Sequence, residues 1–140
     1  MKPKTAKSKY KAVMLIDDSE TDNYVHEIII KKSGFAENVY KHSGGVSSLE
    51  FLKNIEMLRP IIFRSLLPSY LFLDINMPVL DGFQFLDEFI NFSKSLKKGV
   101  KIVILSSSAN SIDIEKASHY NEVVKFLQKP LTAEDLKSLN

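Results

Sequence analysis

A short run of large apolar residues, Tyr70 to Leu73, ends abruptly at the carboxylate of Asp74. A run of this kind, bounded by polar residues, predicts a strand that is buried on both faces of a sheet. The segment that follows contains Pro78 and Gly82, which are typical of a loop. Ligands of open parallel sheets bind at the carboxyl ends of the strands, where the loops diverge. We therefore expect Asp74 to lie at a ligand-binding edge.

Three other apolar runs also end in polar side chains. They are Val13 to Ile16 before Asp17 and Asp18, Val103 to Leu105 before Ser106, and Val123 to Leu127 before Lys129 and Pro130. If these strands are parallel neighbours, their carboxyl ends meet at one edge of the sheet. Three carboxylates, a hydroxyl group and an ammonium group would then converge there.

Segments with helical spacing of apolar residues alternate with these strands. The first covers 20–32, and its apolar residues are Tyr24, Val25, Ile28 and Ile29. A short and more polar strand over 38–41 fits the edge of a parallel sheet better than its centre. The alternation predicts an α/β protein with a doubly wound parallel sheet, helices on both faces and right-handed crossovers.

The later helices are predicted from the same spacing and from capping residues. The third covers 81–92, and we assign its aromatic stripe to the core. The fourth begins after Asn110 or Ser111 as its N-cap and ends near Tyr120. The last begins at Thr132, with Asp135 placed for a capping box.

Composition predicts one globular domain over 10–140, because 140 residues with 44% hydrophobic content suffice for one buried core. The chain has no cysteine, which excludes a disulfide scaffold and a thiolate metal site. It has no apolar run long enough for a signal peptide or a membrane span, so we expect a cytoplasmic protein. The lysine-rich segment 1–9 is predicted to be a disordered basic tail.

The strand ends together resemble the receiver domain of two-component response regulators. The resemblance rests on the pair Asp17 and Asp18, on Asp74 in Leu-Asp-Ile-Asn-Met-Pro-Val-Leu-Asp-Gly, on Ser106, and on Lys129 followed by Pro130. These features occur in the order of the family and cover the chain from Ala12 to Leu139. The resemblance implies a flavodoxin-like sheet of five strands in the order 2-1-3-4-5.

The same resemblance implies a phosphoryl-accepting site that uses Mg²⁺. Asp74 would be the phosphoacceptor. Asp18, Asp74 and the backbone carbonyl of Asn76 would bind the metal, and Asp17 would act largely through a metal-bound water. Clustered carboxylates need such a cation, because they otherwise repel one another and one takes up a proton. Mg²⁺ suits them because it prefers oxygen ligands.

The family also assigns roles to residues of the fourth and fifth strands. Lys129 and the Ser106 hydroxyl would stabilise charge on the transferred oxygens. Ser106 and Phe126 would form the switch, and the bond between Lys129 and Pro130 would be cis. The phosphoryl donor would be a phosphohistidine on a sensor histidine kinase or phosphotransfer protein. A downstream protein would dock on the surface of the fourth helix, fifth strand and fifth helix.

The resemblance thus implies a signalling receiver in a phosphorelay, which is not an enzyme because it catalyses only its own phosphorylation and dephosphorylation. A Mg²⁺-dependent aspartyl-phosphate phosphatase or hydrolase is an alternative, although Asn76 stands where such an enzyme would have a second acidic residue. A receiver-like interaction module that accepts no phosphate is another. Taken singly, Asp17 and Asp18 could cap a helix and Lys129 could pair with any carboxylate.

The segment from Ile55 to Ser69 departs from the family, which needs about a dozen fewer residues here. Pro60 and Pro68 prevent one continuous helix. A second helix is predicted after Gly45, with an apolar side that runs from Val46 to Ile55. Two interpretations of the segment that follows stay open: an extension of this second helix that packs on the sheet, and an exposed apolar patch for a partner or for self-association. Its apolar residues are Met57, Leu58, Ile61, Ile62, Phe63, Leu66 and Leu67.

Overall fold

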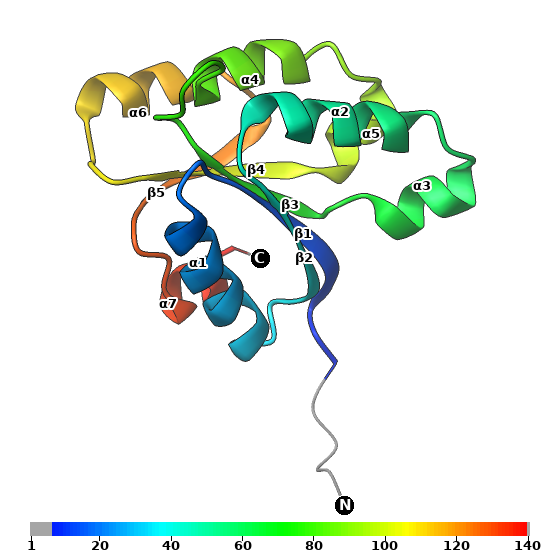
Figure 1. The fold of residues 1–140 in the computed structure, drawn as a ribbon, viewed down its shortest axis with the longest axis horizontal. Coiled ribbons are helices and arrows are strands. Elements are labelled where there is room, and N and C mark those ends of the chain that lie inside the picture. The colour runs from blue at the N-terminus through cyan, green and yellow to red at the C-terminus, as the bar shows by residue number, and fades with distance from the viewer. Residues whose placement is uncertain (1–6, 140) are drawn as a thin grey trace, which may run out of the picture.

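The computed structural model describes residues 7–139, and they form a five-stranded parallel sheet with helices on both faces (Figure 1). The strand order is β2-β1-β3-β4-β5, which confirms the predicted fold class and order. The strands are β1 (Tyr10–Ile16), β2 (Ala36–His42), β3 (Tyr70–Asp74), β4 (Lys101–Ser106) and β5 (Val123–Gln128).

Most of the predicted basic tail, residues 1–6, lies outside the described residues. Lys9, the last residue of that tail, already donates its backbone N–H to the carbonyl of Gly34 at 2.9 Å. Backbone hydrogen bonding to the rest of the fold therefore includes Lys9, the residue before β1.

Two apolar layers hold the helices against the sheet (Figure 1). Helices α1 and α7 cover one face, and α2, α3, α4, α5 and α6 lie on the other. The strands β1, β3 and β4 are buried along most of their length, whereas β2 and β5 at the edges are more polar. The helices are α1 (Glu20–Lys32), α2 (Gly45–Glu56), α3 (Pro60–Leu66), α4 (Gly82–Phe89), α5 (Lys94–Gly99), α6 (Ser111–Ala117) and α7 (Ala133–Lys137).

Helix α1 has the predicted bounds but buries polar residues. Asn23 and His26 face the sheet, while Tyr24 is 61% exposed and Ile28 is 46% exposed. The Asn23 amide donates to the carbonyl oxygens of Asp17 at 3.1 Å and His42 at 3.3 Å, so it ties the ends of β1 and β2 to the helix. Most of the apolar residues that predicted this helix therefore point to solvent.

The helix predicted over 81–92 is shorter than expected. Helix α4 has Asp81 as its N-cap in a capping box with Gln84, and it ends at Phe89. A separate short helix, α5, follows with Ser93 as its N-cap, and it was not predicted. The Glu56 carboxylate accepts a hydrogen bond of 2.6 Å from the Ser93 N–H, which links the end of α2 to the start of α5.

The segment between α2 and β3 is not an extension of α2, so that interpretation was wrong. Helix α2 ends at Glu56, and α3 begins anew with Pro60 at its first turn. Phe63 and Leu67 are partly buried against the core. The other apolar side chains of the segment lie outward, with Met57 85% exposed. The structure thus leaves an exposed apolar patch here, and its use by a partner stays a prediction.

The last two helices have the predicted N-caps. The Asn110 side chain accepts from the Ile112 N–H at 2.8 Å, and Thr132 and Asp135 form a capping box. Helix α6 ends at Ala117, which is earlier than predicted, and turn residues connect it to β5. Within residues 7–139, none of the helices has the length and apolar character needed to cross a membrane.

Candidate functional site

Three carboxylates meet at the carboxyl edge of the sheet, as the strand ends predicted. Asp17 and Asp18 follow β1, Asp74 ends β3, and β1 and β3 are parallel neighbours. One carboxylate oxygen of each lies within 4.8 Å of the others. Asp17 and Asp74 are buried and Asp18 is exposed, so the cluster opens to solvent on one side.

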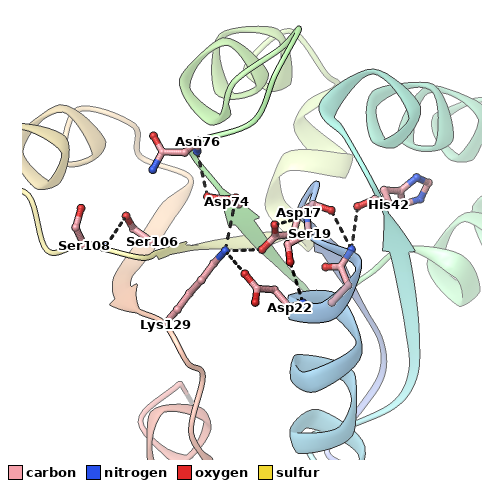
Figure 2. A network of polar contacts seen from close by, with 10 residues as sticks. Asp17, Ser19, Asp22, His42, Asp74, Asn76, Ser106, Ser108 and Lys129 are labelled. Carbon is pink, nitrogen blue, oxygen red and sulfur yellow. Dashed lines mark hydrogen bonds and ion pairs between the residues drawn. The ribbon is translucent and has the colours of Figure 1, made fainter.

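The Lys129 ammonium lies among these carboxylates, although its residue follows the far edge strand β5 (Figure 2). Its Nζ lies 2.6 Å from Asp17 Oδ2 and 3.6 Å from Asp74 Oδ2. The Ser19 N–H donates to the other Asp17 oxygen at 2.9 Å, which orients that carboxylate. The ammonium therefore pairs mainly with Asp17 and stands at the side of Asp74.

Burial raises the pKa of Asp74 to about 6, even though the Asn76 N–H donates to its Oδ1 at 3.0 Å. The negative charge of Asp17 adds to the increase, and the positive charge of Lys129 opposes it. A carboxyl group with this pKa is mostly ionised at pH 7 but lies near its titration point. An added cation would stabilise its charged form.

Burial alone would lower the pKa of Lys129, but hydrogen bonds to Asp17 and Asp22 outweigh it and raise the pKa above its ordinary value. The lysine is therefore a fixed positive charge at neutral pH. A fixed ammonium beside a carboxylate can stabilise negative charge that develops on a group reacting with that carboxylate.

Ser106, Phe126 and Pro130 lie around the fourth and fifth strand ends. Ser106 is fully buried, and its Oγ accepts from the Ser108 N–H at 3.3 Å. The Lys129 N–H donates to the Ser106 carbonyl at 2.8 Å, which joins the two strand ends. Phe126 is partly buried against the core, and the Lys129–Pro130 peptide bond is cis.

The sequence analysis missed Asp22, whose Oδ2 lies 2.9 Å from Lys129 Nζ. Asp22 lies in the first turn of α1, and its N–H donates to the Ser19 hydroxyl at 3.1 Å. The available signal was its spacing from Asp18, since a carboxylate one helical turn beyond a strand end faces the same edge. That spacing is equally typical of a helix start, where acidic residues are common.

The donor set fits a hard divalent cation such as Mg²⁺. All three side chains offer carboxylate oxygens, which this ion prefers, and the open side leaves room for water. Within residues 7–139, these aspartates are the one group of acidic, histidine or cysteine side chains close enough to share an ion. His26 and His42 lie outside it, and burial lowers the pKa of both.

Comparison with known proteins identifies the family of this fold and site. The model of the response regulator receiver domain matches residues 13–139. The probable methanogenesis regulatory protein FilR2 of Methanothrix harundinacea is 32% identical over 120 residues, which cover 83% of this chain and 72% of that protein. The response regulator Rcp1 of Synechocystis is 28% identical over 126 residues, 90% of this chain and 81% of Rcp1.

Solved structures agree with this assignment. A two-component response regulator from Cytophaga hutchinsonii superposes with a TM-score of 0.82 at 29% identity, covering 92% of each chain. The Mn²⁺-bound form of Rcp1 superposes with a TM-score of 0.68 at 25% identity, covering 92% of this chain and 88% of that one. The chain belongs to the response regulator receiver family, whose members are signalling modules.

Proposed function

We propose that this receiver accepts a phosphoryl group on Asp74 from a phosphohistidine in a Mg²⁺-dependent reaction and signals by docking to another protein. The observation that carries the proposal is the position of Asp74. It ends the central strand, has Lys129 at 3.6 Å, and lies with Asp17 and Asp18 in one carboxylate cluster. The Mn²⁺-bound form of its relative Rcp1 supports a cation in this family.

The transfer follows from the groups around Asp74. An Asp74 carboxylate oxygen attacks the phosphorus, the P–N bond to the imidazole breaks, and its electron pair stays on the imidazole nitrogen. An acyl phosphate forms on Asp74. Lys129 and the Ser106 hydroxyl would stabilise negative charge on the transferred oxygens.

The metal would be held by Asp18 and Asp74 and by the Asn76 carbonyl, with Asp17 acting largely through a metal-bound water, as the family resemblance implies. When bound, Mg²⁺ supplies charge neutralisation for the carboxylates and the transferred oxygens. The Asn76 N–H keeps the Asp74 carboxylate oriented through its hydrogen bond to Oδ1.

The proposed donor is a sensor histidine kinase or a phosphotransfer protein. The exposed side of α1 supports this, because Tyr24, Val25 and Ile28 form an apolar strip on the helix that starts at the site. Such a strip suits a protein partner better than a small donor. The carboxylate cluster is reached beside it through the exposed Asp18.

For the output we propose the surface of α6, β5 and α7, which are the fourth helix, fifth strand and fifth helix of the sequence analysis. Ile112, Ile114 and Val124 are exposed there and offer apolar contacts to a partner. Ser106 would move toward the phosphoryl group, and Phe126 would move into the space that it leaves. Burial of the ring would favour its inward position.

Intact-mass analysis tests the acceptor. With acetyl phosphate and Mg²⁺, the wild-type protein should gain one phosphoryl group and Asp74→Asn should gain none. Asp113→Asn, which changes a carboxylate in α6, is the matched control and should be modified like wild type. Equal modification of Asp74→Asn and wild type would refute Asp74 as the acceptor.

NMR spectroscopy of the beryllofluoride complex tests the output. Aromatic and methyl resonances of Phe126, α6 and α7 should shift together with those around Asp74. If the shifts stay confined to the neighbours of Asp74, this route for the signal is wrong.

A further inference from the structure

The Lys129 ammonium has three hydrogens, and three carboxylates surround it (Figure 2). Asp17 lies 2.6 Å from Nζ, Asp22 lies 2.9 Å from it, and Asp74 lies 3.6 Å from it. Two carboxylates at hydrogen-bond distance thus hold the ammonium away from the third. The third is the proposed phosphoacceptor.

Asp22 differs from Asp17 in what else it can bind. Asp17 belongs to the carboxylate cluster that fits a cation, and Asp22 does not. A cation in the cluster would attract the Asp17 carboxylate and so weaken its interaction with Lys129, but it would leave the ion pair of Asp22 and Lys129 intact. The Asp22 backbone is fixed by its hydrogen bond to Ser19, and its side chain is 40% exposed.

We propose that Asp22 competes with the transferred phosphoryl group for Lys129 and thereby slows phosphoryl acceptance at Asp74. This inference rests on the proposed function. To donate to a phosphoryl oxygen on Asp74, Nζ must move toward Asp74 and weaken its charge-assisted hydrogen bond to Asp22. Asp22 is therefore a positioning residue, which acts on the reaction through the lysine.

The test compares variants of the whole chain in the initial rate of phosphorylation by acetyl phosphate with Mg²⁺. Asp22→Asn should react about fivefold faster than wild type, as expected from the loss of one competing charge-assisted bond. Asp22→Glu keeps the charge and should stay near the wild-type rate. Glu20→Gln removes the same charge from the same helical turn without touching Lys129, and it should change the rate much less.

Two further measurements separate competition for the lysine from a general effect on charge or folding. In the Lys129→Met background, Asp22→Asn should no longer raise the rate, because the ammonium for which Asp22 and the phosphoryl group compete is absent. In protein labelled with ¹³Cε-lysine and free of Mg²⁺, the Lys129 methylene resonance should shift in Asp22→Asn and stay in place in Glu20→Gln.

The inference is overturned if Asp22→Asn reacts no faster than Glu20→Gln, reacts more slowly than wild type, or keeps its gain with Lys129→Met. In each of these cases the proposed function is still supported if the wild-type protein is phosphorylated on Asp74. If wild type is not phosphorylated on Asp74, the proposed function fails and this inference fails with it.

Discussion

Gly82 lies so close to Ile75 that a β-carbon on Gly82 would be 2.6 Å from the Ile75 α-carbon. The Gly82 N–H also donates to the Ile75 carbonyl at 3.1 Å. The two contacts close the loop that follows Asp74 and return the chain to the sheet at the start of α4. The geometry of the proposed acceptor loop thus requires a residue without a β-carbon at position 82.

We predict that Gly82→Ala lowers the free energy of unfolding by about 1–3 kcal/mol, because the new methyl group meets backbone that cannot move aside cheaply. Chemical denaturation measures the change. Gly44→Ser is the matched control, since nothing lies within 4 Å of a β-carbon there and serine can cap α2. A loss in Gly44→Ser as large as in Gly82→Ala would contradict the steric argument.

The raised pKa of Asp74 predicts a pH-dependent stability. Its folded pKa of about 6 lies above the ordinary value of 3.8, so the folded state binds the proton more tightly than the unfolded state. This contribution is fully present below pH 4 and is lost as the pH rises through 6. Asp74→Asn should therefore be more stable than wild type at pH 7.5, by on the order of 2 kcal/mol.

Denaturation at several pH values without Mg²⁺ checks this prediction. The advantage of Asp74→Asn should shrink steadily between pH 7 and pH 4. Glu50→Gln changes an exposed carboxylate of α2 and should show no such trend. An advantage that is constant over this range would mean that ionisation of Asp74 is not its source.

The carboxylate cluster predicts that Mg²⁺ stabilises the protein without any phosphodonor. A cation that binds the folded state alone raises the melting temperature, and the gain grows with the logarithm of the cation concentration once this exceeds the dissociation constant. Asp18→Ala should lose most of this gain, because it removes one of the three carboxylates. The effect should also weaken below pH 6, where Asp74 takes up a proton.

Thermal melting in Ca²⁺-free buffer, with and without Mg²⁺, measures the increase in melting temperature. Glu37→Gln, which removes an exposed charge outside the cluster, is the control. Glu37→Gln should gain as much as wild type. If Mg²⁺ raises the melting temperature of Asp18→Ala as much as that of wild type, Asp18 is not a metal ligand.

The partly buried side of α3 predicts a contrast between two apolar residues that lie two positions apart and therefore point to different sides of the helix. Phe63 packs against the core, whereas Ile61 is 77% exposed. Phe63→Ala should lower the free energy of unfolding by about 2 kcal/mol, and Ile61→Ala should change it by less than about 0.5 kcal/mol. Similar losses in chemical denaturation would mean that α3 is held differently.

The sequence predicted the sheet and the converging carboxylates well, because buried parallel strands leave a strong signal. Each central strand is a short apolar run, and each run ends at a polar residue such as Asp17 or Asp74. Parallel pairing then brings the ends together without further information. Five strands in the expected order are the result.

The helices were predicted less well, because the side that a helix buries depends on its neighbours. Asn23 is buried since its amide ties two strand ends, and apolar spacing cannot show this. The helix predicted over 81–92 ends at Phe89, and Glu56, far away in sequence, supports the start of α5. Asp22 was missed because its partner, Lys129, is 107 positions away.

The edge strands have a consequence for how this protein can associate. Lys41 on β2 is held by Glu27 of α1 at 2.8 Å, and β5 carries the exposed Lys125. A foreign strand that paired with either edge would remove water from these charged side chains, which is unfavourable. Charged residues on edge strands are a common protection of native proteins against sheet extension and fibril growth. We expect complexes of this protein to form through its helices and loops, and its sheet to end at five strands even in concentrated solution.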